Sequence, residues 1–268
     1  MIDYGVHPVL GVRIAAVDYA CAVKKIVAHA KEGEPYAVTA LAVHGVMTGF
    51  LDSVHQRRLN GLDLVVPDGQ PVRWGLSLLH KISLPDRVYG PELTLRLMSA
   101  AEEEQLPVFL YGSTEKTIKL LAERLCEKYP GLIIAGMAPS KFRRLTAIGQ
   151  QEVVAQIKAS GAKMVLVGLG CPRQETWVYE YRNKLPMPLI AVGAAFDFHA
   201  GLLPQAPAWM QKRGLEWLFR MIQEPKRLWR RYLFLNPLYL FNLFAERLGM
   251  KRIPVLLPEH NEKEESYG

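Results

Sequence analysis

The chain has 268 residues, of which 50% are hydrophobic and 22% are charged, and this balance excludes disorder over most of its length. Its three cysteines lack the spacing of metal ligands or of a Cys-x-x-Cys motif, which predicts reduced cytosolic thiols. The first residues contain no basic region followed by an apolar one, so we expect no signal peptide.

Short apolar runs alternate with helical patterns from Val9 to about Asp197. Strands are expected at residues 9–16 (a strand or a hairpin), 36–43, 62–66, 108–111, 132–135, 164–167 and 189–192. One helix is expected to begin near Asp18, and another, after the strand at 36–43, to end at Arg58. Further helices are expected at 71–80, 91–105, 114–128, 146–159 and 174–184. Strands that alternate with helices indicate right-handed βαβ units. The sequence therefore predicts an α/β fold with a mainly parallel, Rossmann-like sheet flanked by helices.

The composition changes after Gly201, where prolines interrupt the pattern. Two further helices are expected at 209–221 and 225–244, the second with Pro225 at its first position. We therefore divide the chain into an α/β domain at 1–203, a basic helical appendage at 204–252 and a polar tail at 253–268, which we expect to be disordered.

The appendage carries ten Lys and Arg residues against three acidic ones between Trp209 and Arg252. This surplus predicts a polyanionic partner, either a membrane surface, a nucleic acid or a phosphorylated ligand. The apolar run at 232–244 is too short to cross a bilayer of ~30 Å, but it could lie in the membrane interface. Alternatively, its aromatic side chains pack on the main domain and the arginines form a solvated face.

The stretch Lys163–Trp177 combines a buried strand, a glycine turn and a polar helix start. Gly168 and Gly170 would let the backbone approach a ligand, and the N–H groups at the helix start favour an anion such as a diphosphate. In open α/β sheets such a turn lies at the carboxyl end of the strand, where ligands bind. A plain strand-to-helix connection is the alternative.

Four other strand ends carry candidate ligand groups. Asp68 follows an apolar strand beside Gly69 and could serve as a general base, or it could only cap a helix or close an Asx-turn. Thr39 and His44 end another strand, and a lone histidine there is often structural. The two remaining ends are Tyr111-Gly112-Ser113, and Phe196-Asp197 after a run of small residues.

Several motifs are missing. The chain has no G-x-G-x-x-G followed by an acidic residue, no P-loop and no G-x-S-x-G elbow, which disfavours dinucleotide oxidoreductases, P-loop enzymes and hydrolases. It also has no Asp-x-Asp pair to hold Mg²⁺ or Mn²⁺ against a nucleotide diphosphate. We therefore expect no metal, and we expect arginines and N–H groups to stabilise any diphosphate that leaves.

Six segments in the same order resemble the WecG/TagA/CpsF bacterial glycosyltransferases (family 26), and the match runs from about Val9 to Phe244. The segments are VVPDGQPVRW, RVYG, LYGS, VGLGCPRQETW, VGAAFDFHAG and QAPAWMQKRGLEWLFRMIQEPKRLWRRY. The resemblance implies an inverting transferase that moves a sugar from a UDP-sugar to a polyprenyl-diphosphate-linked saccharide. It also implies a cytoplasmic protein held peripherally at the inner membrane face. The resemblance leaves open whether the protein forms a homo-oligomer. The donor sugar in typical members is N-acetylmannosamine or its uronic acid.

The resemblance also implies roles for individual residues. The proposed general base of the family falls on Asp68, and a second catalytic position falls on Arg87. Gln174 and Asp197 fall near the nucleotide-sugar. Arginines of the appendage, which is thought to fold over the pocket at the membrane, fall on Arg220, Arg227 and Arg230.

One segment departs from the family pattern. Many members carry Thr-x-Asn where this chain has Thr39-Ala40-Leu41-Ala42-Val43-His44. His44 could replace the missing asparagine, and Glu92 stands near a common aspartate, so the donor sugar could differ. The full set of expected substrate contacts is Thr39, His44, Gly69, Tyr111, Gly112, Gly168, Gly170, Gln174 and Asp197.

Two other function classes fit parts of the sequence. A basic α/β nucleic-acid-binding protein would use the appendage to follow phosphates, but the chain contains no recognised nucleic-acid motif, so we expect no nucleic-acid partner. A sugar-nucleotide hydrolase or isomerase could use the same scaffold without a lipid acceptor.

Overall fold

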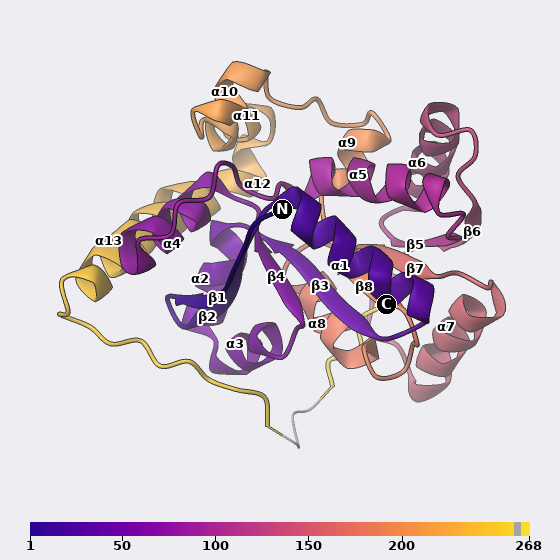
Figure 1. Ribbon diagram of the computed structural model, residues 1–268, viewed down its shortest axis with the longest axis horizontal. Helices are drawn as coiled ribbons and strands as arrows, with labels where there is room; N and C mark the ends of the chain where they lie inside the picture. The colour runs from indigo at the N-terminus through magenta and orange to yellow at the C-terminus, as the bar shows by residue number, and fades with distance from the viewer. Residues whose placement is uncertain (260–263) are drawn as a thin grey trace.

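The computed structural model describes residues 1–259 and 264–268, except for the side chains of Ala208, Lys212, Arg227, Arg230 and Arg231. Its centre is a six-stranded parallel sheet with the strand order β4-β3-β8-β7-β5-β6 (Figure 1). The strands are β3 (Tyr36–Leu41), β4 (Leu64–Pro67), β5 (Val108–Gly112), β6 (Ile134–Ala138), β7 (Met164–Gly168) and β8 (Pro188–Ala191). The predicted α/β class and parallel sheet are confirmed.

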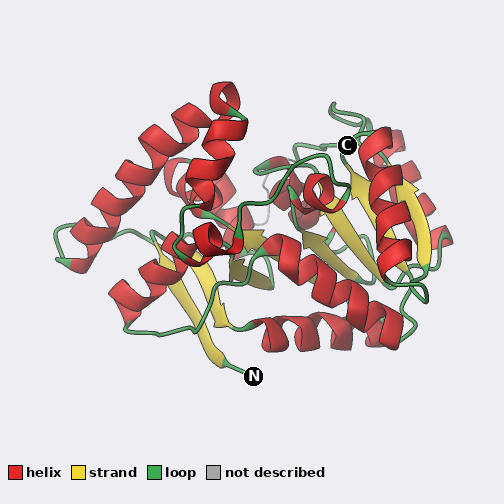
Figure 2. Cartoon of the chain, turned by 90° about the horizontal axis from the view of Figure 1, so that it is seen from above, coloured by secondary structure: helices red, strands yellow, loops and turns green. Residues whose placement is uncertain are grey.

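Helices cover both faces of the sheet, as Figure 2 shows from above. Strand residues alternate between the faces, so Val165 and Val167 of β7 belong to one core and Met164 and Leu166 to the other. The first core receives α2 (Val43–Leu51), α3 (Ser53–Asn60), α4 (Gln70–His80), α7 (Ala147–Ala159) and α8 (Arg173–Tyr181). The second receives α1 (Tyr19–Glu32), α5 (Gly90–Glu103), α6 (Glu115–Lys128) and α9 (Ala195–His199).

The amino-terminal residues form the antiparallel hairpin of β1 (Asp3–Val9) and β2 (Val12–Val17). Its turn residues, Leu10 and Gly11, have φ values of 50° and 81°, as the two central residues of a type I′ turn require. The hairpin alternative for residues 9–16 is therefore correct, although the first strand begins earlier than expected.

Several helix boundaries differ from the sequence pattern. The helix expected up to Arg58 is divided into α2 and α3, because the side chain of Asp52 accepts hydrogen bonds from the backbone N–H groups of Val54 (2.9 Å) and His55 (3.1 Å). That carboxylate caps a new helix. The short helix α9 stands where we expected a loop.

The appendage contains α10 (Ala208–Lys212), α11 (Glu216–Gln223), α12 (Pro225–Arg230), the π-helical turn η1 (Arg231–Leu235) and α13 (Asn236–Arg247). The helix expected at 209–221 is interrupted at Gly214, whose φ of 70° lies in the left-handed region that glycine adopts readily. Helix α13 lies along α4, where the Tyr239 hydroxyl donates to the Pro71 carbonyl at 2.9 Å. The appendage is thereby attached beside the start of α4, which follows Asp68.

The described end of the tail contacts the main domain. The Glu180 carboxylate accepts hydrogen bonds from the N–H groups of Glu265 (2.6 Å) and Ser266 (3.0 Å), and the Ser140 hydroxyl donates to the Gly268 carbonyl at 2.7 Å. Residues 264–268 therefore lie against the main domain, whereas residues 260–263 lie outside the described chain.

Candidate active site

The carboxyl ends of the central strands enclose a cavity of about 370 Å³. Its lining comes from the segments after β3, β4, β5, β6, β7 and β8, from Tyr89 and Pro91, and from α11. Six of the site residues predicted from the sequence line it, namely Asp68, Gly168, Gly170, Gln174, Asp197 and Arg220. These residues are far apart in the sequence, and the parallel sheet brings them together at one edge.

Asp68 lies directly after β4 at the boundary between this cavity and a smaller one of about 90 Å³. One of its carboxylate oxygens, Oδ1, accepts a hydrogen bond from the Gly90 N–H group at 2.5 Å. Burial raises the pKa of this carboxyl from 3.8 to about 6, although Arg87 and the Gly90 N–H act in the opposite direction. A carboxylate with this pKa can accept a proton near neutral pH.

Arg87 is buried behind Asp68 and paired with a residue of the appendage. Its Nη2 lies 2.5 Å from Oε2 of Glu216, the first residue of α11. The other oxygen of Glu216 accepts a hydrogen bond from the Tyr89 hydroxyl at 2.7 Å, and the Arg87 guanidinium lies 4.2 Å from the centre of the Tyr89 ring. This cluster of Arg87, Tyr89 and Glu216 attaches α11 to the main domain next to Asp68.

Gln174 stabilises the glycine turn after β7. Its side-chain oxygen accepts from the Gly170 N–H at 3.1 Å, and its side-chain nitrogen donates to Glu175 at 2.9 Å. The same Glu175 oxygen accepts from the Thr39 hydroxyl at 3.2 Å. Burial raises the pKa of Glu175 above its usual value. Gln174 thus borders the cavity while its amide holds the turn in place.

Three of the predicted contacts lie beneath the cavity. Thr39 is fully buried and bonded to Glu175, and the buried Tyr111 ring stacks on Trp177 with centroids 4.6 Å apart. Gly112 lies so close to Gly168 that an added Cβ would stand 2.7 Å from the Gly168 carbonyl oxygen. In this conformation these three residues support the cavity floor. Of the predicted segment Tyr111-Gly112-Ser113, only Ser113 lines the cavity.

Three further predicted residues line the smaller cavity. His44, Gly69 and Arg87 line it together with Asp68 and Arg220. Asp68 and Arg220 therefore border both cavities. The guanidinium of Arg220 also lies 5.5 Å from the centre of the Phe198 ring. Arg227 and Arg230 belong to α12, but their side chains lie outside the described residues.

Sequence reasoning missed Glu216, Tyr89 and Arg173 as site residues. In the sequence Glu216 is one of three acids in a basic segment, yet in the fold it is buried against Arg87. Tyr89 stands in the RVYG segment and lines the larger cavity. Arg173 precedes Gln174, is exposed, and lines the same cavity. The position of Arg173 beside the glycine turn is the feature of the sequence that could have predicted it as a further cationic contact for a ligand.

Two features of the described residues bear on metal ions and membranes. In residues 1–259 and 264–268, no group of three or more His, Cys, Asp and Glu side chains is arranged to hold a metal ion. None of the helices in that part of the chain combines the length and the apolar character needed to cross a membrane.

Comparisons with known proteins identify the family of the chain. The model of the family described as "Glycosyl transferase WecG/TagA/CpsF family" matches residues 7–253. An N-acetylglucosaminyldiphosphoundecaprenol N-acetyl-beta-D-mannosaminyltransferase of Bacillus spizizenii (strain ATCC 23059 / NRRL B-14472 / W23) is 33% identical over 194 residues, which cover 72% of this chain and 73% of that protein. A protein of the same name from Bacillus subtilis (strain 168) is 31% identical over 194 residues, with the same coverage.

Proposed function

The chain belongs to the WecG/TagA/CpsF family of glycosyltransferases, and on this premise we propose that it transfers a sugar from a UDP-sugar to a polyprenyl-diphosphate-linked saccharide with inversion at the anomeric carbon. The observation that carries the proposal is the position of Asp68, a carboxyl with a pKa of about 6 at the junction of two cavities. We assign the larger cavity to the UDP-sugar and the smaller one to the reacting part of the acceptor.

In the proposed reaction, Asp68 accepts the proton of the acceptor hydroxyl. The acceptor oxygen then forms a bond to the anomeric carbon while the bond from that carbon to the diphosphate breaks on the opposite face, and UDP leaves with the bonding electrons. Because Asp68 borders both cavities, it can lie between the donor and the acceptor. General base assistance of this kind contributes roughly 10²–10⁴-fold to a rate.

Arginine side chains are the proposed counter-charges for the diphosphate. Arg220 borders both cavities and Arg173 lines the larger one, and guanidinium groups bind phosphate oxygens with two parallel hydrogen bonds. Arg87 lies behind Asp68 in an ion pair with Glu216. We propose that Arg173 and Arg220 take the place of a metal ion and stabilise the negative charge that develops on the leaving group.

The donor sugar that we propose is N-acetylmannosamine or a close relative. The proposal is supported by the names of the two Bacillus proteins, which are N-acetyl-beta-D-mannosaminyltransferases that act on N-acetylglucosaminyldiphosphoundecaprenol. His44 lines the acceptor-side cavity rather than the larger one. A role for His44 as the substitute for a donor contact therefore requires a movement of α2 or of the substrate.

The pH dependence of turnover tests the role of Asp68. The burial that raises its pKa to about 6 means that the carboxylate, the form that accepts a proton, is populated only above that pH. We expect kcat/KM for the donor to rise with pH through a limb near pH 6, and we expect this limb to be absent from the residual activity of Asp68→Asn. An acid limb near pH 4 in the wild-type protein would contradict a buried base.

We also propose that the appendage binds the surface of a membrane that contains the lipid acceptor. Large apolar side chains of the appendage are exposed, including Ile222 (67%), Phe234 (66%) and Phe241 (68%), within a segment that carries a surplus of basic residues. Apolar side chains beside basic ones favour insertion into the interface of an anionic membrane.

We expect the protein to sediment with vesicles of anionic phospholipid, and we expect the double variant Phe234→Ser, Phe241→Ser to lose most of this binding. The matched control is Ile148→Ser on α7, which removes an equally exposed side chain (68%) from the main domain. Equal loss in the control, or stronger binding to duplex DNA than to vesicles over a salt series, would contradict the assignment of the appendage to a membrane.

The experiment that tests the activity itself is a turnover assay. A thermal-shift panel of UDP-, GDP- and dTDP-sugars identifies the nucleotide, and UDP release is then followed with and without a short-chain lipid-diphosphate N-acetylglucosamine. We expect release that depends on the acceptor and a new glycosidic bond in the lipid product. Release at the same rate without the acceptor would indicate a sugar-nucleotide hydrolase instead.

A further inference from the structure

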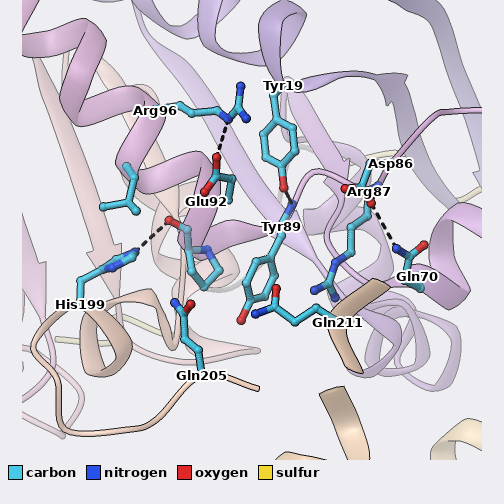
Figure 3. Close-up of a pocket in the computed structure, with 12 residues that line it drawn as sticks. Tyr19, Gln70, Asp86, Arg87, Tyr89, Glu92, Arg96, His199, Gln205 and Gln211 are labelled. Carbon is cyan, nitrogen blue, oxygen red and sulfur yellow. Dashed lines mark hydrogen bonds and ion pairs between the residues drawn. The ribbon is translucent and has the colours of Figure 1, made fainter. Parts of the chain in front are cut away.

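A third cavity of about 280 Å³ lies beside the two that Asp68 borders. It lies between the segment Asp86–Arg96 and the segment that leads from α9 into α10, as Figure 3 shows. It shares Tyr89 and Pro91 with the donor cavity, and Gln70 and Arg87 with the smaller cavity. A ligand in this cavity therefore lies next to the reacting groups without touching Asp68.

The lining of this cavity is rich in amides and aromatic rings. Three glutamines, Gln70, Gln205 and Gln211, line it together with the rings of Tyr19 and Tyr89 (Figure 3). Each amide offers both a donor and an acceptor, which suits the neighbouring hydroxyl groups of a sugar, and aromatic faces pack against the C–H groups of a pyranose ring. The volume of about 280 Å³ lies just below the roughly 300–1,000 Å³ of small-molecule pockets, which suits one sugar ring.

The charges around the cavity favour a neutral ligand. Both guanidinium groups that line it already have carboxylate partners, since Arg87 pairs with Glu216 at 2.5 Å and Arg96 with Glu92 at 2.8 Å. His199 donates to the Pro91 carbonyl at 2.8 Å, and burial lowers the pKa of His199 below its usual value. A phosphate group would thus meet no uncommitted cation among the described residues that line this cavity.

One buried polar atom lacks a partner here. The side-chain nitrogen of Gln70 donates to Asp86 at 3.2 Å, but its oxygen accepts no hydrogen bond from any residue in the described part of the chain. Gln70 is only 6% exposed, and a buried acceptor without a donor is destabilising. Gln70 lines both this cavity and the smaller one.

We propose that this cavity is a saccharide subsite that holds the sugar ring of the acceptor, so that the reacting hydroxyl of that ring extends into the smaller cavity, which Asp68 borders. The proposal rests on the proposed function. The acceptor, rather than the donor, is favoured because Gln205 and Gln211 belong to the appendage, and because Gln70 and Arg87 connect the cavity to the acceptor-side cavity. The subsite distinguishes acceptors by the hydroxyl and amide groups of that ring, whereas the diphosphate and lipid are bound elsewhere.

The test compares two soluble probes, a short-chain lipid diphosphate with N-acetylglucosamine attached and the same lipid diphosphate without the sugar. In a titration of the wild-type protein we expect the sugar to strengthen binding. Of the three cavities, Gln205 and Gln211 line only this one. We expect Gln205→Ala and Gln211→Ala each to weaken binding of the sugar-bearing probe by roughly 2- to 12-fold, which corresponds to the net contribution of one hydrogen bond. Binding of the sugar-free probe and of UDP should stay unchanged.

A cavity-filling variant gives an independent measurement. Leu95 lines the cavity, and Leu95→Phe should abolish the advantage of the sugar-bearing probe without removing a polar group. Gln151→Ala, an exposed glutamine on α7, is the matched control and should bind both probes like the wild type. In turnover assays the variants should raise the KM for the acceptor and leave the KM for the donor unchanged.

Three results would overturn the proposal. The wild type could bind both probes equally, the variants could weaken both probes equally, or the variants could raise the KM for the donor instead. Failure of the proposed function has a different signature, because UDP release would then not depend on the acceptor, whereas the titrations would still report whether the cavity binds a sugar.

Discussion

Replacing Asp68 with asparagine is expected to lower turnover by about 10²–10⁴-fold, the range that a positioned general base contributes. Asparagine keeps the shape of the side chain and can still accept a hydrogen bond from the Gly90 N–H group, but it cannot take up the proton of the acceptor. Binding of UDP should be retained, since Asp68 borders the donor cavity without being one of its cations.

Stability provides the control for this variant. A carboxyl whose pKa is raised from 3.8 to about 6 in the folded state destabilises the protein as pH rises from about 4 to 6, and the full penalty persists above pH 6. Asp68→Asn removes that ionisation, so its unfolding temperature at pH 8 should equal or exceed that of the wild type. Turnover at the wild-type rate, or a folded state lost at pH 8, would contradict the assignment of Asp68 as a buried base.

The second large effect is expected for Glu216→Ala, which removes the carboxylate that holds α11 against Arg87 and Tyr89. Leaving one partner of a buried ion pair unmatched costs about 3–5 kcal/mol. Because α11 is short and lies outside the main cores, we expect this cost to appear as release of α11. Arg220, one turn further along α11, would then leave the two cavities, and kcat/KM should fall by about 10²-fold or more.

Amide hydrogen exchange over residues 216–223 measures the release of α11, and exchange there should become faster than in the wild type. Glu127→Ala, an exposed acid on α6, should change neither exchange nor turnover. A buried pair can often be replaced by apolar residues without loss of stability, so Arg87→Met combined with Glu216→Leu should restore slow exchange. Turnover should stay low in that double variant if Arg87 acts in the reaction, and full recovery of turnover would contradict a catalytic role for Arg87.

The order of strands and helices could be predicted because each strand is a short apolar run between helical patterns, and the hydrophobic period carries that information. Asp68, Gly170 and Gln174 could be recognised as site candidates because they follow such runs, and parallel strands end at one edge of the sheet. The sequence pattern could not show which polar side chains turn inward. Thr39 and Tyr111 were expected to contact substrate, but they are buried against Glu175 and Trp177.

The contact between the appendage and the main domain was also beyond sequence reasoning. Glu216 and Arg87 are far apart in the chain, and their pairing depends on how α11 packs after the left-handed turn at Gly214. A count of charges makes Glu216 one of a few acids in a basic segment, because the count ignores where each charge lies in the fold. Burial instead makes this one acid the anchor of the segment.

The most direct test of the account is the configuration of the bond that the enzyme forms. We propose that Asp68 acts as a base between donor and acceptor and forms no covalent bond to the sugar, so one displacement inverts the anomeric carbon. NMR of the lipid product from an α-linked UDP-sugar should therefore show a β-glycosidic bond whose formation requires Asp68. A product with the α configuration retained, or a sugar covalently attached to the protein during turnover, would contradict the account.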